Sequence, residues 1–305
     1  MVTESDQGVT MPDTGSTVPR RQLGRYLREL RQQSGMTIAQ VARLIERGAT
    51  TLQKLETAQA DRIREWDIEA ICRVLGADET TTAALKGLAQ QGNTKSWWHE
   101  YGDLIPADFN VYVGLESAAT RLTSFQELVP GLFQTADYAR TLIRGVYPAE
   151  PASEIARRLE MKMHRQVLIT RKTHPVEVDV ILDESVLHRV VGSPRIMTAQ
   201  LRRLADWATR PNVTLRVLPY SAGVPLGDLT GPFTILDFGA GQRDQSSEPS
   251  VVYIENYTGD MYHEAWASVD RYRSAHETMR RVALDPTQSK DLLRRVAGGS
   301  EGVRR

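Results

Sequence analysis

The sequence predicts a multidomain protein: an N-terminal all-α bundle of about five helices that contains a helix-turn-helix, then a larger α+β domain with a mainly antiparallel sheet. The chain of 305 residues exceeds the ~100–200 that one core usually serves. Apolar residues recur with helical period from Gln22 to about Ala77. After Trp97, β-rich runs such as HPVEVDVILDE and SVVYIEN alternate with helical stretches. This change of pattern separates the two domains.

The helices of the first domain are predicted from their apolar stripes and from one capping signal. The first helix ends near Ser34 and Gly35, and Thr37 then offers an N-cap with Gln40 three residues later, which is the capping-box arrangement. A tight connection joins the second helix to the third, as in a helix-turn-helix. The residues expected to be buried are Leu23, Leu27, Leu30, Val41, Leu44, Ile45, Leu52, Leu55, Ile63, Trp66, Ile68, Ile71, Val74 and Leu75.

The segment GRYLRELRQQSGMTIAQVARLIERGATTLQKLE resembles the Cro/phage-repressor-like helix-turn-helix family, also called the XRE family. Ala42, Ile45 and the run LQKLE at 52–56 match the family pattern without an insertion. The resemblance implies a register-fixing ion pair between Arg31 and Glu56. It also implies a departure at Ile38, where the family usually has a glutamine that contacts the DNA backbone.

The connection between the second and third helices allows two geometries. In the first, Glu46 takes a left-handed backbone conformation, which costs a non-glycine residue roughly 1 kcal/mol. In the second, the helix continues to Arg47 and Gly48 becomes the left-handed residue that ends it, so that the third helix changes direction. We favour the strained turn at Glu46, because Ile45 and Leu52 keep the family spacing.

In either geometry the third helix exposes polar side chains that suit DNA. Thr50 and Gln53 can reach base edges, whereas Arg47, Thr51 and Lys54 are better placed for phosphates. Although the net charge of the chain is zero, residues 19–75 carry eleven basic and seven acidic side chains. The candidate DNA-binding residues are Thr37, Gln40, Arg47, Ala49, Thr50, Thr51, Gln53 and Lys54.

The remainder of the chain is predicted as a connecting helix and a single α+β domain. Helices are expected at about 134–145, 152–171, 194–209 and 262–283. Gly/Pro-rich turns such as SAGVPLGDLTGP and GAGQRDQSSEP separate the later strands, which indicates an antiparallel meander. The predicted boundaries are 1–19 for a disordered N-terminal segment, 20–78 for the helix-turn-helix domain, 79–96 for the connecting helix and linker, 97–296 for the α+β domain and 297–305 for a disordered tail.

The α+β region also resembles a known family. The motifs Leu115-Glu116, VPGLFQT at 129–135 and Tyr138-Ala139-Arg140 fit the C-terminal domain of unknown function that is fused to many actinobacterial helix-turn-helix regulators. The resemblance implies a transcriptional regulator, often encoded beside a small partner protein, and gives the C-terminal domain no general biochemical role.

The VPGLFQT segment is either a structural turn whose Leu132 and Phe133 enter the core or the wall of a pocket or partner groove, for which nearby polar residues are candidates. Trp97 and Trp98 offer core, dimer-contact or ligand-stacking surface. The candidate ligand or partner residues are Trp97, Trp98, Glu116, Gln126, Gln134, Arg165 and Gln166.

The sequence offers little support for catalysis, cofactors or membranes. Its six histidines show no metal-ligand spacing, and it contains no P-loop and no nucleophile elbow. The only cysteine, Cys72, excludes an internal disulfide and fits a reducing cytoplasm. No apolar run approaches the ~20 residues of a membrane span. We therefore expect no enzyme activity, no metal and no cofactor.

These observations predict a cytoplasmic, homodimeric transcriptional regulator. The helix around 49–58 would enter the major groove of double-stranded DNA, and the C-terminal domain would sense a ligand or a small protein encoded nearby. The alternative is an antitoxin-like or adaptor protein that acts mainly by binding a small partner protein and whose DNA-binding head is degenerate. Ile38 and Glu46 are the features that keep this alternative open.

Overall fold

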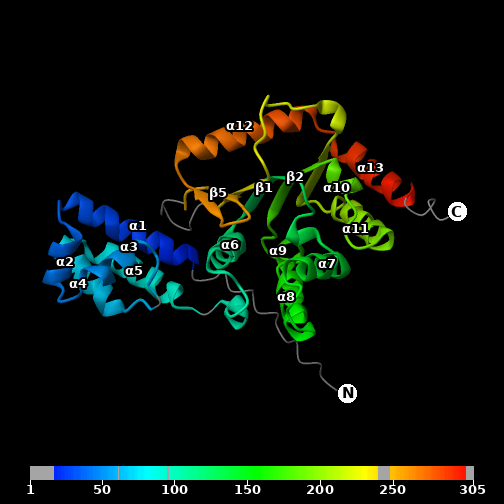
Figure 1. The fold of residues 1–305 in the computed structure, drawn as a ribbon. Coiled ribbons are helices and arrows are strands. Elements are labelled where there is room, and N and C mark those ends of the chain that lie inside the picture. Colours follow the sequence, from blue (N-terminus) through cyan, green and yellow to red (C-terminus); the bar gives the residue numbers. More distant parts are fainter. Residues whose placement is uncertain (1–16, 61, 95, 240–247, 300–305) are drawn as a thin grey trace, which may run out of the picture. The chain divides into compact units, whose positions relative to one another are not determined.

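A computed structural model describes residues 17–60, 62–94, 96–239 and 248–299 of the chain. It divides into two compact units, Met1–Glu100 and Tyr101–Arg305, which we call the helical unit and the α+β unit (Figure 1). We describe each unit by itself. The predicted fold class, a helix-turn-helix bundle followed by a larger α+β domain, is confirmed.

The helical unit is a bundle around one apolar core. Its elements are α1 (Thr17–Gln33), α2 (Ile38–Leu44), α3 (Ala49–Glu56), α4 (Glu65–Leu75), α5 (Glu79–Gly92) and all but the last residue of the short 3₁₀ helix η1 (Trp97–Tyr101). Leu27, Ile68 and Ile71 are completely buried at its centre. Gly24 lets α1 lie directly against α3, because a β-carbon there would meet the backbone oxygen of Leu55 at 2.7 Å.

Two predicted boundaries of the first domain are wrong. The first helix begins at Thr17, so residues 17–19 do not belong to a disordered segment, and residues 1–16 lie outside the described residues. The predicted connecting helix is the fifth helix of the bundle, because Leu85, Leu88 and Ala89 of α5 are buried in the same core as α1 and α4. The boundary at residue 78 therefore cuts through the core.

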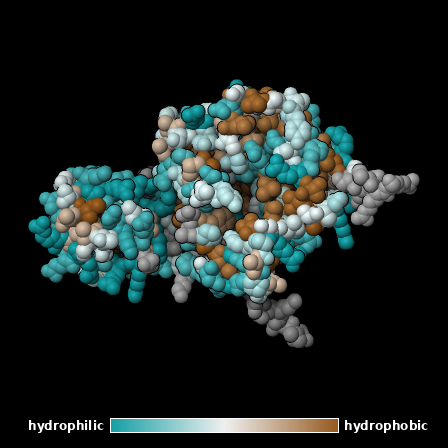
Figure 2. Space-filling view, in the orientation of Figure 1, coloured by the Kyte–Doolittle hydropathy of each residue, from teal (hydrophilic) through white to brown (hydrophobic). Residues whose placement is uncertain are grey.

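Two residues expected in the helical core lie on its surface. Leu44 is 59% exposed at the end of α2, and Trp66 is 51% exposed near the start of α4. Figure 2 shows that the visible face of the helical unit is otherwise largely hydrophilic.

The α+β unit combines a six-stranded sheet with helices on both of its faces. Its strands are β1 (Arg121–Gln126), β2 (Glu177–Asp183), β3 (Val213–Leu218), β4 (Phe233–Asp237), β5 (Val251–Ile254) and β6 (Met261–His263). Its helices are α6 (Ala107–Ala118), η2 (Gly131–Phe133), α7 (Ala136–Val146), α8 (Ala152–His164), α9 (Val167–Thr170), α10 (Ser185–His188), α11 (Pro194–Trp207), η3 (Tyr220–Ala222), α12 (Trp266–Val282) and α13 (Pro286–Gly299).

The sheet is mixed, with strand order β3-β2-β1-β4-β5-β6. The β1/β4, β4/β5 and β5/β6 pairs are antiparallel, as the meander predicted, whereas β1/β2 and β2/β3 are parallel. The turn-rich segment SAGVPLGDLTGP does not close a hairpin, because it leads from β3 at one edge to β4 in the middle. The parallel pairs arise because helical crossovers join β1 to β2 and β2 to β3.

The two faces of the sheet bury different elements (Figure 1). On one face, Val269 and Met279 of α12 pack against Ile235 and Val252 of the sheet. On the other face, Tyr112 of α6 stacks on Tyr253 of β5 with ring centroids 4.1 Å apart. Because side chains alternate along a strand, Tyr253 points away from the face that its neighbour Val252 gives to α12.

Three α-helices of this unit, α6, α10 and α13, were not predicted from the sequence. The helix α6 precedes β1, and α13 follows α12 and packs against α11 and β3. The Ser289 hydroxyl of α13 accepts a hydrogen bond from the Val217 amide at 2.9 Å. Residues 297–299 belong to this helix, with Ala297 buried, so the predicted tail is wrong at these positions; residues 300–305 lie outside the described residues.

Candidate DNA-binding face and ligand pocket

The turn between α2 and α3 has the strained geometry. Glu46 has a φ of 55°, in the left-handed region. The amide of Glu46 donates to the Arg43 carbonyl at 3.2 Å and the amide of Arg47 donates to the Ala42 carbonyl at 2.8 Å, which together form a Schellman motif. Gly48 has a φ of −70° and precedes α3 as its N-cap. The alternative in which Gly48 ends α2 is therefore wrong.

The ends of α2 and α3 are fixed by the two side-chain pairs expected for them. The Thr37 hydroxyl accepts from the Gln40 amide at 3.2 Å, and the Gln40 side chain accepts from the Thr37 amide at 2.8 Å. Arg31 donates to both carboxylate oxygens of Glu56, at 2.6 and 2.9 Å. Since Glu56 is buried, this pair holds the end of α3 against α1.

The helix α3 buries one side and exposes the other. Leu52 and Leu55 are buried in the bundle core, as predicted. The exposed candidates on α3 are Ala49, Thr50, Thr51, Gln53 and Lys54, and Thr37 and Gln40 at the start of α2 are exposed too. Among the described residues, no carboxylate lies within ion-pair distance of Lys54, so its charge remains available to a partner. Their role in DNA binding stays a prediction.

Arg47 differs from the other candidates. Its Nε donates to Asp67 Oδ1 at 2.8 Å, and its guanidinium lies 3.9 Å from the ring centre of Trp66. Both contacts hold the turn against α4. Arg47 therefore has a structural role, and its guanidinium is less available to a phosphate than the side chain of Lys54. Ile38 is half-buried and packs against the helical core instead of offering a polar group.

Five exposed arginines of the helical unit were not among the predicted DNA-binding residues: Arg28, Arg43, Arg62, Arg64 and Arg73. Arg43 lies in the last turn of α2, and Arg64 is the N-cap residue of α4. The charges of these arginines are evident from the sequence. Which of them lie near α3 depends on where the helices begin and end, and this the sequence did not show.

In the α+β unit, Glu116 and Arg165 form a buried ion pair. Arg165 donates to both carboxylate oxygens of Glu116, at 2.8 and 2.7 Å, and Tyr112 donates to Glu116 at 2.9 Å. Burial raises the pKa of Tyr112 well above its usual value, with the nearby Glu116 charge acting in the same direction. The pair ties α6 to the end of α8, a structural role that the sequence could not distinguish from ligand binding.

The three candidate glutamines also bind to the protein itself. Gln134 is buried and donates to the Val129 carbonyl at 2.7 Å. Gln166 donates to the Gln134 carbonyl at 2.6 Å, and Gln126 donates to Thr234 Oγ1 at 3.1 Å. Gln134 and Gln166 thus hold the VPGLFQT segment in place.

Trp97 and Trp98 fall in the helical unit, whereas the other five ligand candidates belong to the α+β unit. Trp98 is buried and Trp97 is half-buried, with ring centroids 5.7 Å apart in an edge-on arrangement. Trp98 therefore takes the core role that was one of its three options.

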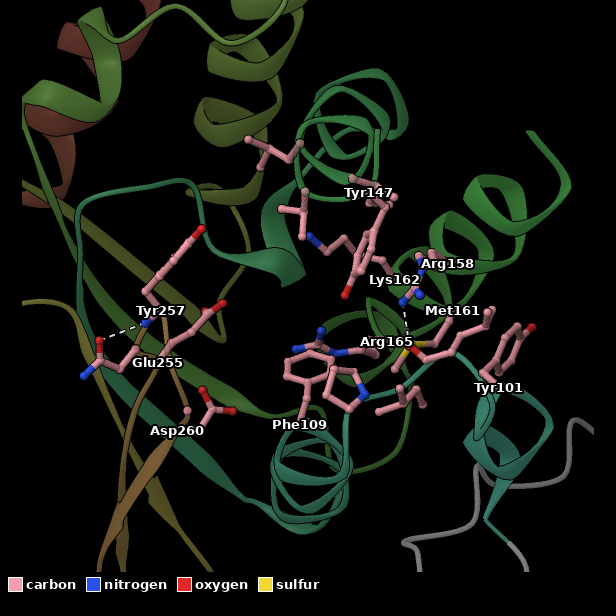
Figure 3. A pocket seen from close by; sticks show the side chains of 18 of the residues that line it. Tyr101, Phe109, Tyr147, Arg158, Met161, Lys162, Arg165, Glu255, Tyr257 and Asp260 are labelled. Atoms are coloured by element: carbon pink, nitrogen blue, oxygen red, sulfur yellow. Dashed lines mark hydrogen bonds between the residues drawn. The ribbon is translucent and has the colours of Figure 1, made fainter. Parts of the chain in front are cut away.

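A pocket of about 510 Å³ opens in the α+β unit between α6, α7, α8 and the residues that follow β5 (Figure 3). This volume lies within the ~300–1,000 Å³ typical of small-molecule sites. Its apolar walls come from Leu104, Ile105, Pro106, Phe109, Leu142, Ile143, Val146 and Met161. Its polar lining comes from Tyr101, Tyr147, Arg158, Lys162, Arg165, Tyr253, Glu255 and Asp260.

The cations of this pocket differ in their partners. Arg158 is bound by both carboxylate oxygens of Glu150, at 2.8 and 2.7 Å, and stacks on Tyr147. Arg165 is neutralised by Glu116. Lys162 donates to Gln134 Oε1 at 3.1 Å, and among the described residues no carboxylate lies within ion-pair distance of it.

Lys162 is partly buried, and its environment weakens its hold on a proton. Burial and the positive charge of Arg165 lower the pKa of Lys162 to about 8, while the charge of Glu255 acts in the opposite direction. At neutral pH this lysine is mostly protonated, although its burial makes the charged form less favourable in free energy than it is in water. Of the predicted candidates only Arg165 lines this pocket. The helical spacing of Arg158, Lys162 and Arg165 was the one sequence signal that pointed to it.

A second pocket, of about 430 Å³, shares a wall with the first. Glu116, Gln126 and Arg165 line it together with the segment from Glu127 to Phe133. The VPGLFQT segment is therefore both a pocket wall and a structural turn, because Leu132 and Phe133 are buried in the core.

Within residues 17–299, outside the gaps given above, no group of three or more His, Cys, Asp or Glu side chains could hold a metal ion. In the same part of the chain, no helix has both the length and the apolar character needed to cross a bilayer.

Comparison with known families supports the division of the chain. Residues 22–85 match the family described as a helix-turn-helix domain (HTH_31). Residues 109–295, more than half of the chain, match the family described as a domain of unknown function (DUF5753). Both resemblances noted in the sequence are confirmed by these matches. No curated protein and no solved structure matches the chain at a significant level.

Proposed function

This chain belongs to the DUF5753 family and carries a helix-turn-helix domain before that domain, and from this premise we propose that it is a cytoplasmic transcriptional regulator that binds operator DNA as a homodimer. A helix-turn-helix domain binds DNA, and the family match supports that coarse function directly. The operator, the dimer and the control by an effector are the finer parts of the proposal.

The observation that carries the proposal is the geometry of the turn at Glu46. The left-handed residue and the Schellman motif keep α3 in the register of a recognition helix. Thr50 and Gln53 are exposed on that helix, where they can meet base edges in the major groove. Lys54 supplies a phosphate contact on the same helix.

A homodimer would place two such helices on half-sites about one turn of DNA apart, roughly 34 Å. One short helix reads few base pairs, so two copies increase both affinity and specificity. The α+β unit would hold the copies together and would gate DNA binding through a ligand or a small protein. An effector shifts the equilibrium only by the difference between its affinities for the two states.

The pocket of the α+β unit supports such a gate. Leu104, Ile105 and Pro106 form part of its wall, and they follow the helical unit directly in the chain. This segment is held to α8 by Arg157, which binds both oxygens of Asp103 at 2.7 and 2.9 Å, and by Arg158, which donates to the Leu104 carbonyl. A ligand in the pocket would therefore contact the first residues of the α+β unit, which are close in sequence to the helical unit.

The experiment that tests the function is selection of fragmented host genomic DNA on the purified full chain, sequenced at low and at physiological salt. We expect a short inverted repeat that survives the higher salt. The double variant Gln53→Ala, Lys54→Ala should lose it, while the matched double variant Lys86→Ala, Gln90→Ala, on α5, should retain it. Light scattering of the same samples measures the molar mass and so tests whether the protein is a dimer.

The result also decides between the regulator and the adaptor. If no sequence is enriched in either salt and the protein instead captures a small protein encoded nearby, the head is degenerate and the adaptor hypothesis replaces the regulator. Ile38, which supplies no polar group to a phosphate, is the feature that still favours the adaptor.

A further inference from the structure

We infer that the 510 Å³ pocket of the α+β unit binds a small monocarboxylic acid with an apolar body, whose carboxylate pairs with Lys162. This inference rests on the proposed effector control and names the chemical class of the effector. It follows from the partners of each charged group, from the apolar walls and from the position of two carboxylates at the rim.

The single unpaired cation defines the charge of the ligand. Arg158 and Arg165 each have a two-point ion pair inside the protein, with Glu150 and Glu116. Lys162 alone among the described cations of the lining has none. A carboxylate that enters the pocket supplies the missing partner, whereas a neutral ligand leaves a partly buried ammonium uncompensated.

The carboxylates on the opposite wall restrict the ligand to one negative charge. Glu255 and Asp260 lie across the pocket from Lys162 (Figure 3). Asp260 accepts a hydrogen bond from the Tyr253 hydroxyl at 2.9 Å, and Glu255 is exposed. Because these charges repel additional anions, a nucleotide or another polyanion is disfavoured, and a hydrogen-bond donor at the far end of the acid would be favoured.

The walls define the body of the ligand. Phe109, Ile143 and Met161 come from α6, α7 and α8, so three helices contribute apolar surface to the pocket that Lys162 lines. Phe109 and Tyr147 are only half-buried, so part of each ring remains open to a ligand. Burial of an apolar body against these side chains provides the main driving force for binding. The ion pair with Lys162 makes the pocket prefer a carboxylic acid over a neutral molecule of the same shape.

The charge state of Lys162 supplies an independent signature. Its pKa of about 8 comes from burial and from Arg165, with an opposing contribution from Glu255. The charged or titratable groups around it are Arg158 on α8, Arg165 directly after α8, Glu116 and Tyr112 on α6, Tyr147 after α7, and Tyr253, Glu255 and Asp260 on and after β5. An incoming carboxylate raises the pKa of Lys162, so binding at pH 8 takes up a proton.

The first test is isothermal titration calorimetry of the full chain at neutral pH with phenylacetate, indole-3-acetate and octanoate, each compared with its primary amide. The amides keep the shape and remove the charge. We expect at least one acid to bind, at least about tenfold more tightly than its amide. The inference is overturned if no acid binds more tightly than its amide.

The second test changes the lysine. Lys162→Met, which keeps most of the side-chain length, should weaken binding of that acid at least about tenfold. Lys172→Met, at an exposed lysine of the same unit, is the matched control and should change nothing. Unchanged affinity in a folded Lys162→Met variant would contradict the inference.

The third test does not depend on the folding of a variant. Titration of the wild-type chain at about pH 8 in two buffers with different ionisation enthalpies measures the protons taken up, and we expect about half an equivalent. An absence of proton uptake would assign the binding to apolar contact alone. None of these measurements involves DNA, so a failure here leaves the DNA-binding proposal intact, and a failure of DNA binding leaves this inference intact.

Discussion

Arg31 and Glu56 form a two-point ion pair, with nitrogen–oxygen distances of 2.6 and 2.9 Å, that fastens the end of α3 to α1. The Glu56 side chain is only 3% exposed. The same arginine donates to the Met36 carbonyl at 3.0 Å, just before α2 begins. The Arg31 guanidinium thus connects the residues before α2 with the end of α3, which are the two ends of the helix-turn-helix.

We expect Glu56→Ala to lower the free energy of unfolding of the helical unit by about 3 kcal/mol, because it leaves the largely buried Arg31 without its partner. Replacement of both residues, Arg31→Met with Glu56→Leu, should recover most of that loss. Urea unfolding of the full chain followed by circular dichroism measures both variants. Equal destabilisation by the single and the double variant would contradict this account.

Gly24 provides a second test of the contact between α1 and α3. A β-carbon there would lie 2.7 Å from the Leu55 oxygen and 2.8 Å from the Glu56 oxygen, which are backbone atoms that cannot turn aside. Gly24→Ala should therefore cost about 2 kcal/mol of stability. The control is Gly87→Ala in α5, where nothing lies within 4 Å of the new atom. It should stabilise the unit, by up to about 1 kcal/mol.

The left-handed turn predicts that Glu46→Gly is stabilising. Glycine adopts a φ of 55° without a steric penalty, so relief of the strain should raise stability by at most about 1 kcal/mol, after the entropy of the more flexible unfolded chain is subtracted. Glu46→Ala keeps the β-carbon and should leave the thermal midpoint nearly unchanged. A destabilised glycine variant would mean that the Glu46 side chain itself supports the turn.

Arg47 and Lys54 should respond differently to neutralisation. Lys54→Gln should reduce the slope of log Kobs against log salt by about 2 for a bound homodimer, because each of its two subunits loses one phosphate contact. Arg47→Gln should change the slope much less and should instead lower the thermal midpoint, because it removes the ion pair with Asp67. Binding isotherms of the selected operator at several salt concentrations measure the slopes, with Lys86→Gln as the control.

Acid should destabilise the α+β unit partly through His276. This histidine is buried, its Nε2 has no hydrogen-bond partner among the described residues, and burial lowers its pKa below 6.5. The charged groups that face it are Asp179, Arg216, Glu277 and Arg280. Because the unfolded chain binds this proton more readily than the native protein, stability falls as the pH drops through 6.5 toward the native pKa.

Urea midpoints measured between about pH 7 and about pH 5 test this account. His276→Gln should remove part of the decline toward low pH, because glutamine takes up no proton at this buried position. An identical pH profile for wild type and His276→Gln would assign the decline to the carboxylates instead.

The sequence by itself determined the features of this protein that depend on neighbours a few residues apart. The capping box of Thr37 and Gln40 and the periodic apolar stripes act within one or two helical turns, so they can be recognised without the fold. The left-handed Glu46 followed from the spacing of Ile45 and Leu52, and the Arg31–Glu56 pair followed from the family resemblance.

Only the tertiary structure decided which of these features meet. It placed α5 in the helical core and made two strand pairs parallel, because burial and pairing join segments far apart in the chain. The ligand pocket is the clearest case. Phe109, Tyr147, Lys162 and Glu255 come from four separate elements, and no local pattern marks their convergence. Lys162 differs from an ordinary helical lysine because the surrounding elements bury it and because Arg158 and Arg165 already bind the carboxylates of Glu150 and Glu116.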